Sequence, residues 1–75
     1  MYETRVFPIK GLDLKKICND IAKKDETFKF KLLEHELLIY SKDRETAFRR
    51  GGWFRHIIKK EFGKEVWYDV RYARE

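Results

Sequence analysis

The sequence predicts a small α+β domain in which helices cover one face of a sheet of three or four strands. Segments in which apolar residues alternate are separated by segments in which they recur every three or four residues. Apolar residues make up 43% of the chain and aromatic residues 16%, which is too much for a disordered segment. Because 75 residues support one small core, we expect residues 1–75 to form a single domain.

The first half of the chain is predicted to contain a strand, a helix and two further strands, in that order. They span residues 2–9 (strand), 12–24 (helix), 27–33 (strand) and 37–40 (strand). Residues 2–9 alternate, and Pro8 ends that strand or places it at an edge. The helix carries an apolar stripe that includes Cys18. In the second strand Lys29 and Lys31 occupy the face opposite the phenylalanines, so they form a basic outer row.

The second half is predicted to contain a helix that is interrupted by two glycines, and then a strand. The helical segments span residues 43–50 and 53–62, and the strand spans residues 64–73. Asp43 is a plausible N-cap, and Gly63 is well placed as the left-handed residue that ends the helix. In the last strand Tyr68 and Tyr72 are expected to face inward.

This order of elements fits two architectures. If residues 43–62 form one helix, the order is that of a ferredoxin-like βαββαβ sandwich. If the helix breaks at Gly51 and Gly52, the second half is a strand, helix, turn, helix and strand unit.

The positive charge is concentrated in one window. The chain has a net charge of +5, and residues 42–60 contain seven basic and two acidic residues, which accounts for the whole excess. Such a surplus favours a polyanionic partner, and the alternative is a solvated basic surface without one.

Residues 37–72 resemble the core of a K-homology (KH) domain of type II. The matching parts are the strand at residues 37–40, the helical segments on either side of Arg49-Arg50-Gly51-Gly52, and Gly63 before the closing strand. The resemblance implies a loop that holds the backbone of single-stranded nucleic acid, RNA in particular. In this chain Arg49 stands where the first glycine of the Gly-x-x-Gly signature would be, so its side chain is expected to supply a phosphate contact.

The resemblance and the charge together predict a non-enzymatic module that binds single-stranded RNA or another nucleic acid. Arg55 and Lys59 share one helix face and would extend the contact made by the loop. The predicted binding residues are Lys42, Arg49, Arg50, Gly51, Gly52, Arg55, His56 and Lys59.

Two alternatives remain open. One is a protein–protein interaction module of ferredoxin-like fold, such as a homodimer formed through a strand edge, which the number of aromatic residues favours. The other is a small regulator whose basic face meets an acidic protein.

Other classes of function lack a signal. The two histidines have no ligand spacing and the single cysteine has no partner, so we expect neither a metal, nor a cofactor, nor a disulfide. No apolar run could span a membrane and no signal peptide is visible, which favours the cytoplasm and no membrane partner. The absence of glutamine, with many Lys, Arg and Glu residues, suggests a thermophilic source.

Overall fold

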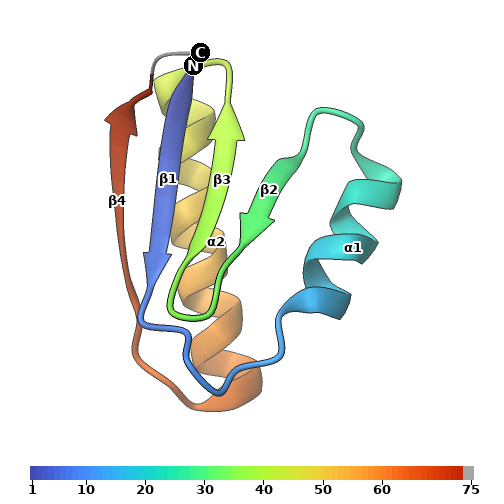
Figure 1. Ribbon diagram of the computed structural model, residues 1–75, viewed down its shortest axis with the longest axis vertical. Helices are drawn as coiled ribbons and strands as arrows, with labels where there is room; N and C mark the ends of the chain where they lie inside the picture. Colours follow the sequence, from blue (N-terminus) through green and yellow to red (C-terminus); the bar gives the residue numbers. More distant parts are fainter. Residues whose placement is uncertain (74–75) are drawn as a thin grey trace.

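The computed structural model describes residues 1–73, which form one four-stranded antiparallel sheet and two helices (Figure 1). The elements are β1 (Tyr2–Phe7), α1 (Lys15–Lys24), β2 (Lys29–Leu32), β3 (Leu37–Ser41), α2 (Arg44–Phe62) and β4 (Trp67–Tyr72). The strands lie in the order β2-β3-β1-β4, and every neighbouring pair is antiparallel. The predicted α+β class is confirmed.

Both helices lie on the same side of the sheet. Figure 1 looks onto the opposite face, with α2 behind β1 and β3 and with α1 beside β2. Helix α2 contacts β1, β3 and β4, whereas α1 contacts β2. Among the described residues no helix covers the face that Figure 1 presents, which we call the open face.

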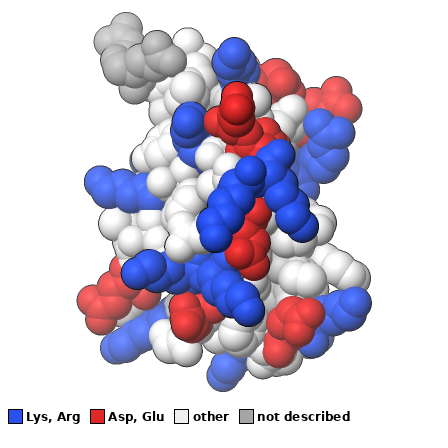
Figure 2. Space-filling model, turned by 90° about the vertical axis from the view of Figure 1, so that its right-hand side faces the viewer, with Lys and Arg blue, Asp and Glu red and all other residues white. Residues whose placement is uncertain are grey.

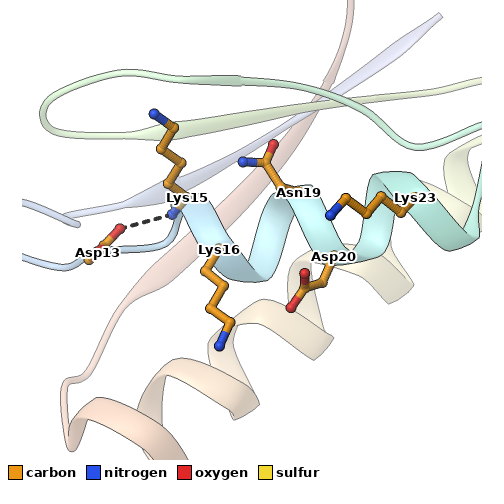
Figure 3. A pocket seen from close by; sticks show the side chains of 6 residues that line it. All are labelled: Asp13, Lys15, Lys16, Asn19, Asp20 and Lys23. Atoms are coloured by element: carbon orange, nitrogen blue, oxygen red, sulfur yellow. Dashed lines mark hydrogen bonds between the residues drawn. The ribbon is translucent and has the colours of Figure 1, made fainter.

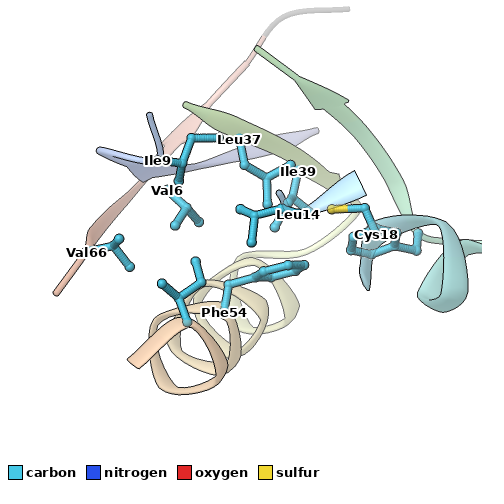
Figure 4. Close-up of a cluster of buried hydrophobic side chains, with 10 residues drawn as sticks. Val6, Ile9, Leu14, Cys18, Leu37, Ile39, Phe54 and Val66 are labelled. Atoms are coloured by element: carbon cyan, nitrogen blue, oxygen red, sulfur yellow. The ribbon is translucent and has the colours of Figure 1, made fainter. Parts of the chain in front are cut away.

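The core lies between the sheet and the helices (Figure 4). Strands β1 and β3 supply Val6, Leu37 and Ile39, and α2 supplies Phe54 and Ile58, all of which are almost completely buried. Leu14 and the α1 residue Cys18 bring the first helix into the same cluster. The inward residues of β1 include a polar one: the hydroxyl of Thr4 donates to the carbonyl of Ala47, 2.9 Å away, so its burial is compensated.

Helix α2 is continuous from Arg44 to Phe62, so the break predicted at Gly51 and Gly52 is wrong. The presence of glycine at these positions has a different explanation. A Cβ on Gly51 would come within 2.8 Å of Cγ of Tyr68, so the missing side chain lets the helix approach β4 closely. The two-helix loop on which the resemblance to KH domains depended is absent. The arrangement is that of the alternative, the βαββαβ sandwich.

The predicted ends of α2 are confirmed. The carboxylate of Asp43 accepts a hydrogen bond from the backbone N–H of Thr46 at 2.7 Å. Gly63 has a φ of 66°, the left-handed conformation that commonly ends a helix.

Other boundaries differ from the prediction. Helix α1 begins at Lys15 and not at residue 12: the chain turns at Lys10 and Gly11, where Gly11 has a φ of 84°, and residues 12–14 belong to no helix or strand. The expected inward position of Tyr68 is confirmed, since it packs against the core. Tyr72 is 68% exposed and does not belong to the core; it is the last residue of β4, an edge strand of the sheet.

Candidate functional site

The residues predicted to bind nucleic acid do not form one surface. Because α2 is one helix, residues one position apart point about 100° away from each other. Arg49 and Arg50 line a hollow of about 260 Å³ together with Ile21 of α1 and with Phe28, which precedes β2. Arg55 and Lys59 line a different hollow, of about 320 Å³, on the side of β4.

Arg50 is bound within the domain. Its guanidinium donates to Oδ2 of Asp25 at 3.2 Å, to Oγ1 of Thr27 at 3.0 Å and to Oγ of Ser41 at 3.2 Å. Its side chain is only 16% exposed. Hydrogen bonds from Thr27, and secondarily Arg50, hold the pKa of Asp25 below its usual value. These contacts join α2 to the turn before β2, so the role that the contacts indicate is structural.

The glycine backbone does not form an anion-binding loop. Gly51 and Gly52 lie inside α2, where backbone N–H groups are used in the helix. Gly51 is buried, and the hydroxyl of Tyr68 lies 3.7 Å from the place where a Cβ of Gly52 would be. The KH resemblance implied that phosphates approach main-chain N–H groups closely at these glycines. The continuous helix does not offer N–H groups for such a contact.

Four of the predicted residues do meet on the β4 side of α2. Gly52, Arg55, His56 and Lys59 surround the 320 Å³ hollow with Glu65. Nζ of Lys59 is 2.6 Å from Oε1 of Glu65, and this hydrogen bond, with the lysine charge, lowers the pKa of Glu65. The guanidinium of Arg55 lies 4.7 Å from the centre of the Trp67 ring, a cation–π contact.

The open face of the sheet carries a set of side chains that the sequence prediction missed. Because Thr4 and Val6 point into the core, the alternate residues of β1 point to the open face. The pairing register places Phe7 beside Trp67 of β4 and Glu3 between Tyr40 of β3 and Arg71 of β4. Aromatic residues of three neighbouring strands thus occupy positions on this face: Phe7 is beside Trp67, and Tyr40 is opposite Glu3, four residues away along β1.

Lysines border this face at β2. Lys29 is the register partner of Tyr40, and Lys31 is the register partner of Leu38. Both are exposed, and neither forms a salt bridge within residues 1–73. Lys42 belongs to the same region, since it lines a hollow of about 470 Å³ with Lys29 and Tyr40. For the two lysines of β2, the only indication in the sequence was the alternation that places them on the outer face of that strand.

The remaining charges of the open face are paired with one another. Arg71 lies 2.8 Å from the nearly buried carboxylate of Glu3. Arg5 lies 3.1 Å from Asp69 and 4.4 Å from the centre of the Phe7 ring. Burial, and then the Glu3 carboxylate, raise the pKa of Tyr40 above its usual value of 10.0, so this ring stays neutral at physiological pH. The two β2 lysines and Lys42 are therefore the cations of this region without a carboxylate partner among the described residues.

The outer surface of α1 offers no comparable site. Charges of both signs are interleaved on the side of the molecule that α1 forms (Figure 2). The hollow along α1 is shown in Figure 3: Lys15 and Asn19 extend to one side of the helix, and Lys16 and Asp20 extend to the other. These side chains do not converge on one point.

Residues 1–73 contain no group of three His, Cys, Asp or Glu side chains that could hold a metal ion. Neither α1 nor α2 has the length and apolarity needed to cross a membrane. Comparison of the chain with protein-family models, with curated proteins and with solved structures found no match. Inference about function therefore depends on the geometry of the chain itself.

Proposed function

We propose that this domain binds single-stranded nucleic acid, RNA in particular, across the open face of its sheet. The observation that carries the proposal is that aromatic residues of three neighbouring strands occupy a face that no described helix covers, with Phe7 beside Trp67 and with Tyr40 opposite Glu3, four residues away along β1. Lysines without carboxylate partners within residues 1–73 border this face. The partner class is the one expected from the sequence. The proposed binding surface differs from the one expected from the sequence. Helix α2 has no loop at Gly51 and Gly52, and Arg50 forms its hydrogen bonds within the domain.

Aromatic residues on an uncovered sheet face suit unpaired bases, here at two separate positions, the Phe7–Trp67 pair and Tyr40. Every base has a π face, and stacking on aromatic side chains contributes roughly 1–3 kcal/mol per base. Trp67 is 54% exposed and offers the largest ring, with Phe7 directly beside it. Four-stranded sheets that bind RNA through aromatic residues of their strands show that this geometry can serve the purpose, which is an argument by analogy.

The cations are placed to hold the phosphates on both sides of these rings. Lys29, Lys31 and Lys42 border the Tyr40 end. Arg55 borders the Trp67 end. Several contacts between lysine or arginine and phosphate would make the affinity strongly dependent on salt.

The first experiment measures binding of a fluorescent oligouridine RNA at several salt concentrations. In Lys29→Ala/Lys31→Ala the slope of log K against log salt should fall by about 1.4, since each lost phosphate contact accounts for about 0.7. Lys23→Ala/Lys24→Ala removes the same charge at the end of α1 and is the matched control, which should keep the slope. Equal slopes in the two double variants would contradict the proposal.

The second experiment locates the bound bases through tryptophan fluorescence. Trp53 lies on α2 between the helices and Trp67 lies on the sheet, so each can be removed separately. RNA should still quench the fluorescence of Trp53→Phe and should no longer quench that of Trp67→Phe. Quenching that survives only in Trp67→Phe would place the bases at α2 instead.

A further inference from the structure

The two edges of the sheet differ in how well they resist pairing with another strand. Strand β2 has four residues and carries Lys29 and Lys31, which are features that discourage edge-to-edge association. Strand β4 has six residues with the sequence WYDVRY, and it contains neither lysine nor proline. The edge of β4 is therefore a ready template for a further strand.

Exposed aromatic side chains gather at this edge. Five large hydrophobic side chains are exposed among the described residues, and three of them border β4: Phe48 (41% exposed), Trp67 (54%) and Tyr72 (68%). Phe48 belongs to α2, and its ring meets that of Tyr68 edge-to-face with a centroid separation of 6.3 Å. Phe48 and Tyr72 lie on the helix side of this edge, and Trp67 lies on the open face. Aromatic residues are enriched at protein interfaces, and here they flank both sides of one strand.

The hydrogen bonds of β4 with β1 identify the backbone groups that are free. Just beyond the Tyr2–Tyr72 pair, the N–H of Ala73 donates to the carbonyl of Met1 at 2.8 Å. In antiparallel strands such pairs alternate, so Arg71 and Asp69 also direct their backbone groups toward β1. The N–H and C=O groups of the intervening residues point to the open edge: Tyr68, Val70 and Tyr72.

We propose that a second copy of this chain pairs with β4 in antiparallel orientation, with Val70 of each copy opposite Val70 of the other. This register joins the free backbone groups of both copies. It sets Asp69 opposite Arg71 of the second copy, an attractive cross-strand pair. It also sets Tyr68 opposite Tyr72 of the second copy, on the side where Phe48 lies.

The neighbouring registers are excluded by charge. Centring the pair on Asp69 would place two aspartates opposite each other, and centring it on Arg71 would place two arginines opposite each other. More distant registers leave part of β4 unpaired. Strand β4 is therefore complementary to itself only in the register centred on Val70, where most of its residues are paired. This self-complementarity is the reason for proposing a second copy of the chain as the partner.

The resulting dimer would have one continuous eight-stranded sheet, with the two-fold axis perpendicular to it at Val70. Both open faces then lie on the same side of the sheet. This inference does not depend on nucleic-acid binding, and its test is carried out without nucleic acid.

The first test is sedimentation velocity over a range of protein concentrations. The unmodified chain should shift from monomer to dimer as its concentration rises. Tyr72→Lys should raise the dissociation constant about tenfold or more, because it removes both Tyr68–Tyr72 pairs and places a lysine without a carboxylate partner opposite each Tyr68. Trp53→Lys, at an exposed tryptophan away from β4, is the matched control and should leave the constant unchanged. A chain that stays monomeric at every concentration would overturn the proposal.

The second test fixes the register by oxidation of single-cysteine variants. Val70→Cys should form a disulfide-linked dimer, because residues opposite each other lie about 5.5 Å apart at Cα, which a disulfide can span. Asp69→Cys and Arg71→Cys are the controls, since their copies are offset by two residues and lie about 7–8 Å apart. The native Cys18 is buried and does not compete. Faster cross-linking at position 69 or 71 would refute this register, and circular dichroism would verify that each variant is folded.

Discussion

Gly51 and Gly52 are adjacent in α2, yet their surroundings differ. The Tyr68 ring occupies the space that a side chain on Gly51 would need. A Cβ on Gly52 would instead lie 3.7 Å from the Tyr68 hydroxyl oxygen, its nearest neighbour, which is an ordinary contact distance. The first glycine is thus required by the packing of α2 on β4, whereas the second is not.

We expect Gly51→Ala and Gly52→Ala to change stability in opposite directions. Gly51→Ala should lower the free energy of unfolding by about 1–2 kcal/mol, because overpacking outweighs the gain in helix propensity. Gly52→Ala should raise it by about 0.5–1 kcal/mol, since alanine favours the helix and fits the space. Urea unfolding followed by circular dichroism would measure both values. A stabilised Gly51→Ala variant would contradict the packing explanation.

Charged residues show that residue type alone does not determine a role. Arg49 and Arg50 are neighbours in the sequence, but Arg50 is largely buried by its contacts with Asp25, Thr27 and Ser41. Within residues 1–73, Arg49 donates only to Thr46, 3.3 Å away on its own helix. Of the two, Arg49 is the arginine that retains donors for a ligand.

At the scale of elements, the contact between Arg50 and Asp25 ties the turn after α1 to the middle of α2. Helix α1 otherwise reaches the core through its buried Cys18 and through the partly buried Ile17, Ile21 and Ala22. Because Asp25 also accepts hydrogen bonds from the backbone and side chain of Thr27, it organises the start of β2 as well. Loss of its charge should therefore loosen the attachment of α1.

We expect Asp25→Asn to lower the melting temperature at neutral pH but not in acid. The pKa of Asp25 is lower in the folded chain than its usual value of 3.8, so ionised Asp25 favours the folded state. This contribution is present above pH 3.8 and is lost as the pH falls through the lowered pKa. Melting curves should thus differ from those of the unmodified chain at about pH 7 and converge as the pH falls through the lowered pKa of Asp25.

Asp20→Asn is the control for this prediction, because it removes one carboxylate from α1 that forms no salt bridge within residues 1–73. It should melt like the unmodified chain at neutral pH and in acid. A difference for Asp25→Asn that persisted unchanged in acid would show that the carboxylate charge is not the cause.

At the scale of the whole molecule, one buried thiol reports on global unfolding. Cys18 is completely buried between α1 and the sheet, and burial raises its pKa to about 11. A thiolate is the reactive form, so both inaccessibility and the raised pKa should suppress modification.

We expect thiol-specific reagents to label Cys18 only when the domain opens. Leu14→Ala, in the same cluster, should destabilise the domain by about 2–4 kcal/mol and accelerate labelling by roughly 30- to 1,000-fold where opening is a rapid equilibrium. Lys23→Ala, an exposed change on α1, should leave the rate unaltered. Mass spectrometry would follow the reaction, and rapid labelling of the native, unmodified chain would contradict this view.

Much of the local structure was determined by the sequence itself. Alternating apolar residues located the strands, and the three- and four-residue spacing located α1 and both halves of α2, which the prediction wrongly separated at Gly51 and Gly52. Asp43 and Gly63 were predicted as the ends of α2, since capping depends on residues only a few positions apart. The outward direction of Lys29 and Lys31 followed from alternation alone.

The candidate site could not be predicted in the same way. Phe7, Tyr40 and Trp67 share one face only because β1 lies between β3 and β4 in a particular register, and these strands are far apart in the sequence. Likewise the ring of Tyr68 decides that Gly51 packs instead of bending the helix. Local patterns determined which segments are helices or strands and which way they face. Only the tertiary structure decided which faces meet, because long-range packing selects among arrangements that the local energies leave nearly equal.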